Sequence, residues 1–292
     1  TLTGGSQILV NAAPGLATFS VGLDGTAFAS LSGASLVDIG TGVTHVGRLS
    51  GGSGTLGLSG GSKLMAGQVN IGGSSDTVAG GLGTATVSGI GSELSASGAS
   101  GFIGVGRRGI GTLSVANQGK VAAITMSVGR SAGGVGTLSV NNATLEFAGQ
   151  QTSGNFVGAG LAIGTGGGSG SATFANGSLV SMNNPGSAGA YLVVGGSTNY
   201  PLGSGTLNVS GGSQVHLTAA PGLARVRIGH DGTGIASFSG ASLLDAGDGD
   251  VIIAGEPGST GLLTLNTGSV LNAGYVGVGS KPGSINGGVG TL

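Results

Sequence analysis

The sequence predicts an all-β fold, a single right-handed parallel β-helix (β-solenoid) of about ten coils of ~29 residues. Three observations predict it. Glycine makes up 70 of the 292 residues, one short motif recurs along the whole chain, and apolar residues alternate with polar residues inside each copy of that motif.

The glycine content excludes a helical protein. Each glycine in a helix interior costs about 1 kcal/mol relative to alanine, and here glycine occupies nearly every fourth position. Collagen is excluded as well, because the glycines follow no three-residue period and the chain has only 6 prolines. The remaining classes are a β-rich repeat protein and a flexible glycine-rich linker.

The recurring motif is Gly-Thr-Leu-x-Val-x-x-Gly-Ser-x-Leu, followed after a variable stretch by Val-x-Val-Gly. It is nearly intact at residues 54–64 and 69–72. Successive copies open 25 to 35 residues apart, at Ala27, Gly54, Gly83, Gly111, Gly136, Gly170, Gly205, Gly234, Gly261 and Gly290. Such variation is expected of a solenoid in which loops differ in length while strands do not. A linker does not hold valine and leucine in fixed columns, and no six-residue period indicates a left-handed hexapeptide helix.

A second repeat is superposed on the first. Residues 4–7 recur at 211–214, and residues 12–17 recur at 219–224, in both cases 207 residues later. These blocks indicate duplication within a long array.

Each unit contains three short segments of period-2 alternation, which we interpret as strands of about four residues. Leu138 and Val140 face one way, and Thr137 and Ser139 face the other. Gly-Gly, Ser-Gly and Asn-Gly pairs between the segments supply the positive φ angles of turns. One coil cannot bury its own apolar face, but coils stacked at ~4.8 Å form continuous apolar ladders, and ten of them give a rod of ~48 Å.

The predicted core consists of the inward positions Leu56, Leu58, Leu64, Val69, Ile71, Leu113, Val115, Leu138, Val140, Leu207, Val209 and Val226. Threonines are expected in an outward column at Thr55, Thr84, Thr112, Thr137 and Thr206. Right-handed winding follows from the crossover preference of parallel strands.

Charge and cysteine content restrict the partners. Lys and Arg number 9 and Asp and Glu number 10, for a net charge of −1, and there is no cysteine. We therefore expect no nucleic-acid partner and no thiolate metal site. No apolar stretch approaches 18 residues, so we expect no membrane insertion of this segment. We expect no cofactor, because the Gly-x-Gly-x-x-Gly matches precede no helical pattern.

The ten-fold recurrence of the motif resembles the repeats of passenger regions of bacterial autotransporters (type V secretion) and of PEP-CTERM-associated surface proteins. The resemblance covers the whole chain. It implies a secreted or surface-displayed β-solenoid, located outside the cell or on the bacterial surface. A signal peptide and a translocator barrel are expected outside these 292 residues.

An acidic cluster is a weak candidate for calcium. Asp245, Asp248 and Asp250 lie within six positions, and hard cations prefer clustered oxygen ligands. The spacing fits neither an EF-hand nor a calcium-binding β-roll, so a solvated loop is the alternative interpretation.

The position after each Val-Gly pair forms a second candidate. Stacking aligns Arg48, Arg107, Arg130 and His230 there, and we define these four residues as the basic column. A basic edge on the surface attracts acidic glycans. The alternative is that these charges are merely spaced along the rod.

Catalysis on β-helices requires acids, bases or arginines that converge on one face. The richest neighbourhood contains Arg225, Arg227, His230, Asp231, Asp245 and Glu256. We expect surface ion pairs there and assign no catalytic residue.

The sequence thus predicts one repeat array over residues 1–292, a segment of a longer chain or a filament subunit. The predicted function is that of an extracellular structural or adhesive rod without enzymatic activity. Its partners are neighbouring repeats or copies stacked end to end, together with surface glycans or host and matrix molecules. The alternative is a carbohydrate-active or carbohydrate-binding β-helix protein, whose turnover of a polysaccharide would distinguish it.

Overall fold

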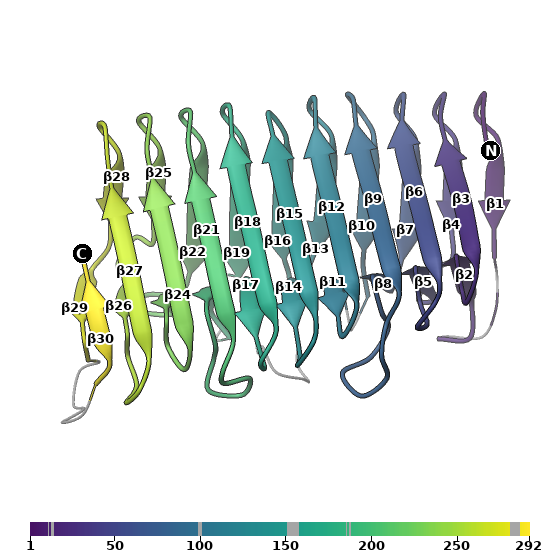
Figure 1. The fold of residues 1–292 in the computed structure, drawn as a ribbon. Coiled ribbons are helices and arrows are strands. Elements are labelled where there is room, and N and C mark those ends of the chain that lie inside the picture. The colour runs from purple at the N-terminus through teal and green to yellow at the C-terminus, as the bar shows by residue number, and fades with distance from the viewer. Residues whose placement is uncertain are drawn as a thin grey trace.

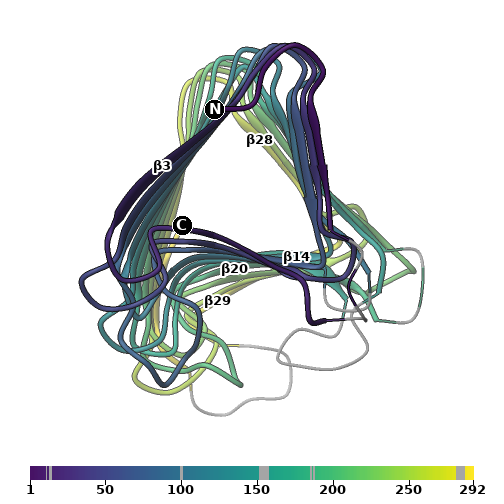
Figure 2. The ribbon, with the colours of Figure 1, turned by 90° about the vertical axis from the view of Figure 1, so that its right-hand side faces the viewer.

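The computed structural model describes residues 1–10, 12, 15–98, 101–150, 158–184, 186, 188–280 and 287–292. These residues form three parallel sheets of ten strands each, stacked into a rod (Figure 1). The rod has a triangular cross-section with one sheet on each side (Figure 2). Neighbouring strands in each sheet come from successive coils, so the predicted parallel β-solenoid of ten coils is confirmed.

We name the sheets A, B and C, and the chain runs through them in the repeating order B, C, A. Sheet A contains β3 (Thr26–Leu31), β6 (Ser53–Ser59), β9 (Leu82–Ser88), β12 (Ile110–Ala116), β15 (Val135–Asn141), β18 (Ser169–Ala175), β21 (Ser204–Val209), β24 (Thr233–Phe238), β27 (Thr260–Leu265) and β30 (Val289–Thr291). Sheet B contains β1 (Gln7–Leu9), β4 (Leu36–Asp38), β7 (Lys63–Ala66), β10 (Glu93–Ala96), β13 (Lys120–Ala123), β16 (Thr144–Ala148), β19 (Leu179–Asn184), β22 (Gln214–Ala219), β25 (Leu243–Asp245) and β28 (Val270–Asn272). Sheet C contains β2 (Thr18–Val21), β5 (Val43–Val46), β8 (Gln68–Ile71), β11 (Phe102–Arg107), β14 (Thr125–Arg130), β17 (Ala159–Thr165), β20 (Ala190–Val194), β23 (Ala224–Ile228), β26 (Asp250–Ile253) and β29 (Tyr275–Val278).

The coil is right-handed. Figure 2 views the rod from its amino-terminal end, with sheet B on the right, sheet C along the bottom and sheet A on the left. The chain passes through B, C and A in that order as it recedes from the viewer, which is a clockwise advance. This winding agrees with the crossover preference of parallel strands.

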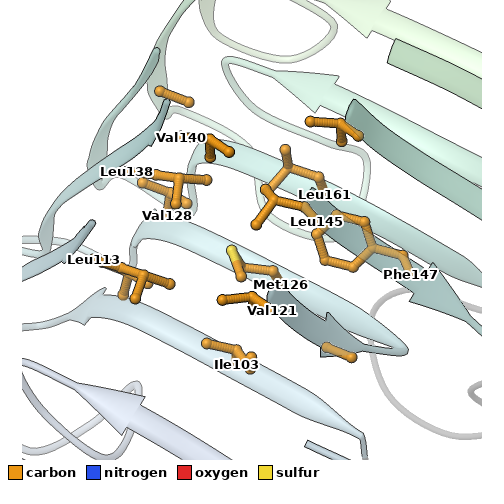
Figure 3. Close-up of a cluster of buried hydrophobic side chains, with 14 of the residues drawn as sticks. Ile103, Leu113, Val121, Met126, Val128, Leu138, Val140, Leu145, Phe147 and Leu161 are labelled. Atoms are coloured by element: carbon orange, nitrogen blue, oxygen red, sulfur yellow. The ribbon is translucent and has the colours of Figure 1, made fainter. Parts of the chain in front are cut away.

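The interior is a set of aliphatic ladders. In sheet A, Leu113 pairs with Leu138 and Val115 with Val140 in adjacent strands. Figure 3 shows Leu113, Leu138 and Val140 pointing into the lumen together with side chains of the other two sheets. All twelve predicted core residues are at most 1 % exposed, so the predicted core is confirmed. Phe147, Phe174 and Phe238 belong to the same core and are fully buried.

The corner between sheet C and sheet A explains the two glycines that recur in each unit. Gly106 has a φ of 72°, and a Cβ there would overlap the carbonyl oxygen of Val135 in the next coil. Gly111, which begins the Gly-Thr-Leu segment, faces the backbone nitrogen of Gly106 in the same way. The corner is therefore closed by backbone against backbone, and only glycine fits at both positions.

The opposite corner, from sheet A to sheet B, explains the serine of the motif. Ser62 is fully buried, and its hydroxyl donates to the carbonyl of Ser59 at 2.7 Å. Ser178 and Ser213 make the same bond to the carbonyl three residues earlier, at 2.6 and 2.7 Å. The serine hydroxyl reinforces the turn, since the same carbonyl of Ser59 also accepts the backbone N–H of Ser62 at 3.2 Å.

The strands are longer than expected in sheet A, where they reach seven residues in β6, β9, β12, β15 and β18. The strand begins at or before the glycine of Gly-Thr-Leu and continues past the valine, so the outward Thr and Ser positions extend it. Longer strands give sheet A the broadest face of the rod.

Candidate functional site

Part of the outward face of sheet C is buried, although it lies on the outside of the solenoid. His45, Asn70 and Ser127 point away from the lumen and yet are at most 6 % exposed. Two long connections, residues 72–81 between β8 and β9 and residues 195–203 between β20 and β21, leave from the corner between sheets C and A. Figure 2 shows loops gathered outside the triangle at this corner.

Asp76 is the centre of a polar network under these loops. Its carboxylate accepts hydrogen bonds from Nε and Nη2 of Arg107 at 3.1 and 3.0 Å. Further bonds come from Nη2 of Arg130 and from Oγ of Ser131, each at 2.7 Å. Arg130 also bonds to the hydroxyl of Tyr200, which belongs to the second loop. The network ties both loops to the strand ends of sheet C.

Electrostatics stabilises the charged form of Asp76. Burial alone would raise the pKa of this carboxyl group, but hydrogen bonds from Arg107 and Ser131 and the charges of Arg130 and Arg107 outweigh it and lower the pKa. For Arg130, burial is the dominant cause and lowers the pKa of the guanidinium group. Burial likewise raises the pKa of Tyr200.

Aromatic rings complete the cluster. The guanidinium carbon of Arg107 lies 5.3 Å from the centroid of the Phe102 ring, and that of Arg130 lies 5.6 Å from the same centroid. Arg130 also lies 4.1 Å from the centroid of the Tyr200 ring. Each arginine is thus held by a carboxylate at one edge and by a ring across its face.

His45 lies on the same covered face, in β5, and is 6 % exposed. Burial, followed by the positive charges of Arg48 and Arg107, lowers its pKa from 6.5 to about 4. Its Nδ1 atom is buried and has no hydrogen-bond partner among the described residues. The ring is therefore neutral at neutral pH.

The structure aligns two residues of the basic column and corrects the exposure expected for the column. Arg107 pairs directly with Arg130 in the register of β11 and β14, as the stacking predicted. Arg130 and His230 are buried, however, at 7 and 8 % exposure, because their part of the outward face of sheet C is covered. Since Asp76 binds both Arg107 and Arg130, the column is not a continuous basic edge on the surface; Arg48 and Arg107 keep partial exposure.

Asp76 was missed by the sequence analysis. The signal that could have found it is the ten-residue gap between Gly72 and Gly83, which is only four residues between Gly106 and Gly111. An acidic residue in the lengthened loop, next to coils that carry arginine, is the pattern of a loop held by ion pairs.

The structure does not bring the three candidate calcium ligands together. Asp245 accepts hydrogen bonds from Nδ2 of Asn272 at 2.8 Å and from the backbone nitrogen of Gly247 at 3.0 Å, and lies 3.2 Å from Nδ1 of His216. Asp250 instead accepts two bonds from Arg227, at 2.9 and 2.8 Å. Within the described ranges, no group of three His, Cys, Asp or Glu side chains could hold a metal ion.

The neighbourhood considered for catalysis separates into independent contacts. Arg227 binds Asp250, while Arg225 lies 5.7 Å from the ring centroid of Tyr191. His230 Nε2 lies 3.0 Å from the hydroxyl of Thr198 and 3.8 Å from a carboxylate oxygen of Glu256. These contacts join neighbouring coils to one another and to the second loop.

Comparisons with known proteins add no relative: no family model matches the chain, and neither a curated protein nor a solved structure is significantly similar to it. In the part of the chain that the structure describes, no helix is long and apolar enough to cross a membrane.

Proposed function

We propose that this chain is a structural or adhesive segment of an extracellular bacterial rod and has no enzymatic activity. The observation that carries the proposal is the unbroken pairing of ten strands in each of three sheets. A filled lumen and continuous ladders give a stiff shaft, in which stability depends on contacts between neighbouring coils.

The ends of the shaft favour assembly along its axis. β1 pairs only with β4, and β28 pairs only with β25, so the described terminal strands of sheet B each have one open edge. Inward apolar side chains are exposed at both ends, including Ile8 at 37 % and Val278 at 44 %. Open edges and exposed ladders are suited to further coils, either of the same chain or of a second copy stacked end to end.

Two measurements test the proposal. Negative-stain micrographs are expected to show rods whose length is ~48 Å or a multiple of it, from ten coils at ~4.8 Å. Antibodies against the purified chain are expected to label intact bacterial cells that produce it. Labelling that requires permeabilised cells, or globular particles in the micrographs, would contradict the proposal.

A second candidate function, the binding of acidic carbohydrate, is favoured by one cleft. Four of the nine basic residues, Arg48, Arg107, Arg108 and Arg130, lie at the corner between sheets C and A. Arg108 lines a cleft of about 370 Å³ whose other walls are mainly glycine backbone, and its Nη1 donates to the backbone carbonyl of Asp76 at 3.2 Å. A guanidinium group in an open cleft suits a carboxylate or sulfate group.

Binding of uronate or sulfated oligosaccharides, measured by calorimetry, tests this candidate. Arg108→Ala is expected to abolish binding, whereas Arg225→Ala, which changes an arginine on another face, is expected to preserve it. Equal binding by both variants would assign the affinity to net charge alone.

A further inference from the structure

Sheet A presents a face without charge. None of its ten described strands contains Asp, Glu, Lys, Arg or His. Its outward positions are mainly Thr, Ser and aliphatic residues. Figure 1 shows this sheet toward the viewer, with no described loop crossing it.

The other two faces are different. Sheet B carries a line of alternating charges on adjacent strands, in which Lys63 and Lys120 bind Glu93, and Lys120 also binds Glu146. Sheet C is covered in part by loops and carries the charged residues Arg225 and Arg227 on its outward face. Sheet A is therefore the one face, in the described part of the chain, that is both bare and uncharged; a protein interface needs such a surface, because charged groups are depleted at interface cores.

An apolar row adds a driving force for association. Leu82, Ile110 and Val135 begin three successive strands and are directly paired in register. They are 52, 51 and 43 % exposed. Adjacent exposed aliphatic side chains on an otherwise polar rod gain free energy when a partner removes them from water.

The outward column two residues further along the strands is nearly symmetric in side-chain size over the nine strands from β3 to β27. Over these strands it reads Phe28, Thr55, Thr84, Thr112, Thr137, Ser171, Thr206, Ile235 and Leu262, and β30 continues it with Thr291. Within the nine strands, Phe28 lies at one end and Ile235 and Leu262 lie at the other, with small hydroxyl residues between them. When the column is reversed about Thr137, Phe28 meets Leu262, Thr55 meets Ile235, and Thr84 meets Thr206.

The area of the face is large enough for a stable dimer. Ten strands at ~4.8 Å and strand lengths of about six residues at ~3.3 Å give roughly 950 Å² per copy. A standard protein interface buries about 800 Å² per partner. We propose that two copies of this chain pack sheet A against sheet A, antiparallel, about a two-fold axis near Thr137.

This lateral pairing goes beyond the end-to-end stacking proposed above and does not depend on it. Sheets packed face to face lie about 10 Å apart with their side chains interdigitated. Two lateral partners thicken the rod, while axial partners lengthen it, so solution scattering separates the two contacts.

Sedimentation equilibrium and small-angle scattering provide the first test. The wild-type chain is expected to form a dimer with an increased cross-sectional radius of gyration. The double variant Thr112→Lys/Thr137→Lys is expected to weaken dimerisation at least tenfold, because four ammonium groups would gather at the two-fold axis, within about two strand spacings of one another. The matched variant Ala122→Lys, which points outward from sheet B, is expected to remain dimeric; circular dichroism verifies that both variants keep their strands.

Cross-linking provides the second test, since the chain has no cysteine and each introduced thiol is unique. With a short bismaleimide, the Thr137→Cys variant is expected to cross-link to the same position of a second copy. Thr84→Cys and Thr206→Cys are expected to cross-link when mixed and not when each is alone. Ala122→Cys is the negative control.

Three outcomes would overturn the pairing: a monomeric wild-type chain, association that lengthens the rod without thickening it, and cross-linking of Ala122→Cys equal to that of Thr137→Cys. A monomeric chain that instead co-sediments with an insoluble uncharged polysaccharide, and loses this in the double lysine variant, would assign the face to a glycan.

Discussion

Arg130 donates a hydrogen bond to the carboxylate of Asp76 at 2.7 Å across 54 residues of sequence. Asp76 lies in the loop after β8, and Arg130 ends β14, so the bond spans two steps of sheet C. With Tyr200 on the other side of Arg130, one guanidinium group joins two loops that the repeat alone does not relate. The covered face of sheet C depends on this contact.

Replacing Asp76 with asparagine is expected to lower the free energy of unfolding by about 2 kcal/mol, because it leaves two partly buried arginines without their counter-ion. Limited proteolysis is expected to cut residues 72–81 faster in this variant. Urea denaturation measures the first effect. Asp24→Asn, at an exposed carboxylate, is the control, and an equal loss of stability in both variants would contradict a special role for Asp76.

Acidification is expected to destabilise the protein through His45. Its pKa is about 4 in the folded chain and 6.5 in the unfolded chain, so the unfolded state binds the extra proton as the pH falls between these values. Folding therefore loses up to about 3 kcal/mol from pH 6.5 to pH 4. Asp76, whose pKa is lowered, adds a further loss only at more acidic pH.

The variant His45→Asn isolates this effect, since Asn70 already occupies the next position of the same ladder. Urea midpoints at pH 7 and pH 4 are expected to differ less in the variant than in the wild type. An unchanged pH dependence would show that other groups govern acid stability.

Two alanine substitutions test why the corner between sheets C and A requires glycine, because both sites have nearly the same positive φ angle. Gly106 and Gly177 have φ angles of 72° and 73°. Gly177 has open space around a Cβ, whereas Gly106 faces the carbonyl of Val135. We expect Gly177→Ala to cost about 1 kcal/mol and Gly106→Ala to cost at least about 3 kcal/mol in thermal unfolding. Equal costs would mean that φ alone selects glycine at the corner.

The charge line on sheet B is tested by Glu93→Lys. The variant places like charges on three neighbouring strands, in line with Lys63 and Lys120, which is expected to cost about 1 kcal/mol at low salt. Most of the loss is expected to disappear at 1 M salt, where the Debye length is about 3 Å. A loss that does not change with salt would indicate a packing defect rather than charge repulsion.

Most of the solenoid could be predicted from the sequence, because the inward direction of Leu138 and Val140 is encoded by local alternation and their stacking by the repeat. The site could be predicted only in part. The alignment of Arg107 with Arg130 follows from the same repeat, but their burial depends on loops that the repeat does not contain. The contact between Asp76 and Arg130 joins a loop to a distant strand, and no local pattern encodes its geometry.

The strand register also determines how the number of coils in such a protein can change during evolution. The blocks that recur 207 residues apart place Gln7 in β1 and Gln214 in β22, both in sheet B and separated by seven whole windings. Each winding contacts chiefly its two neighbours. Genetic exchange that inserts or deletes complete windings therefore preserves every junction, and the length of the rod can be adjusted in steps of one strand spacing.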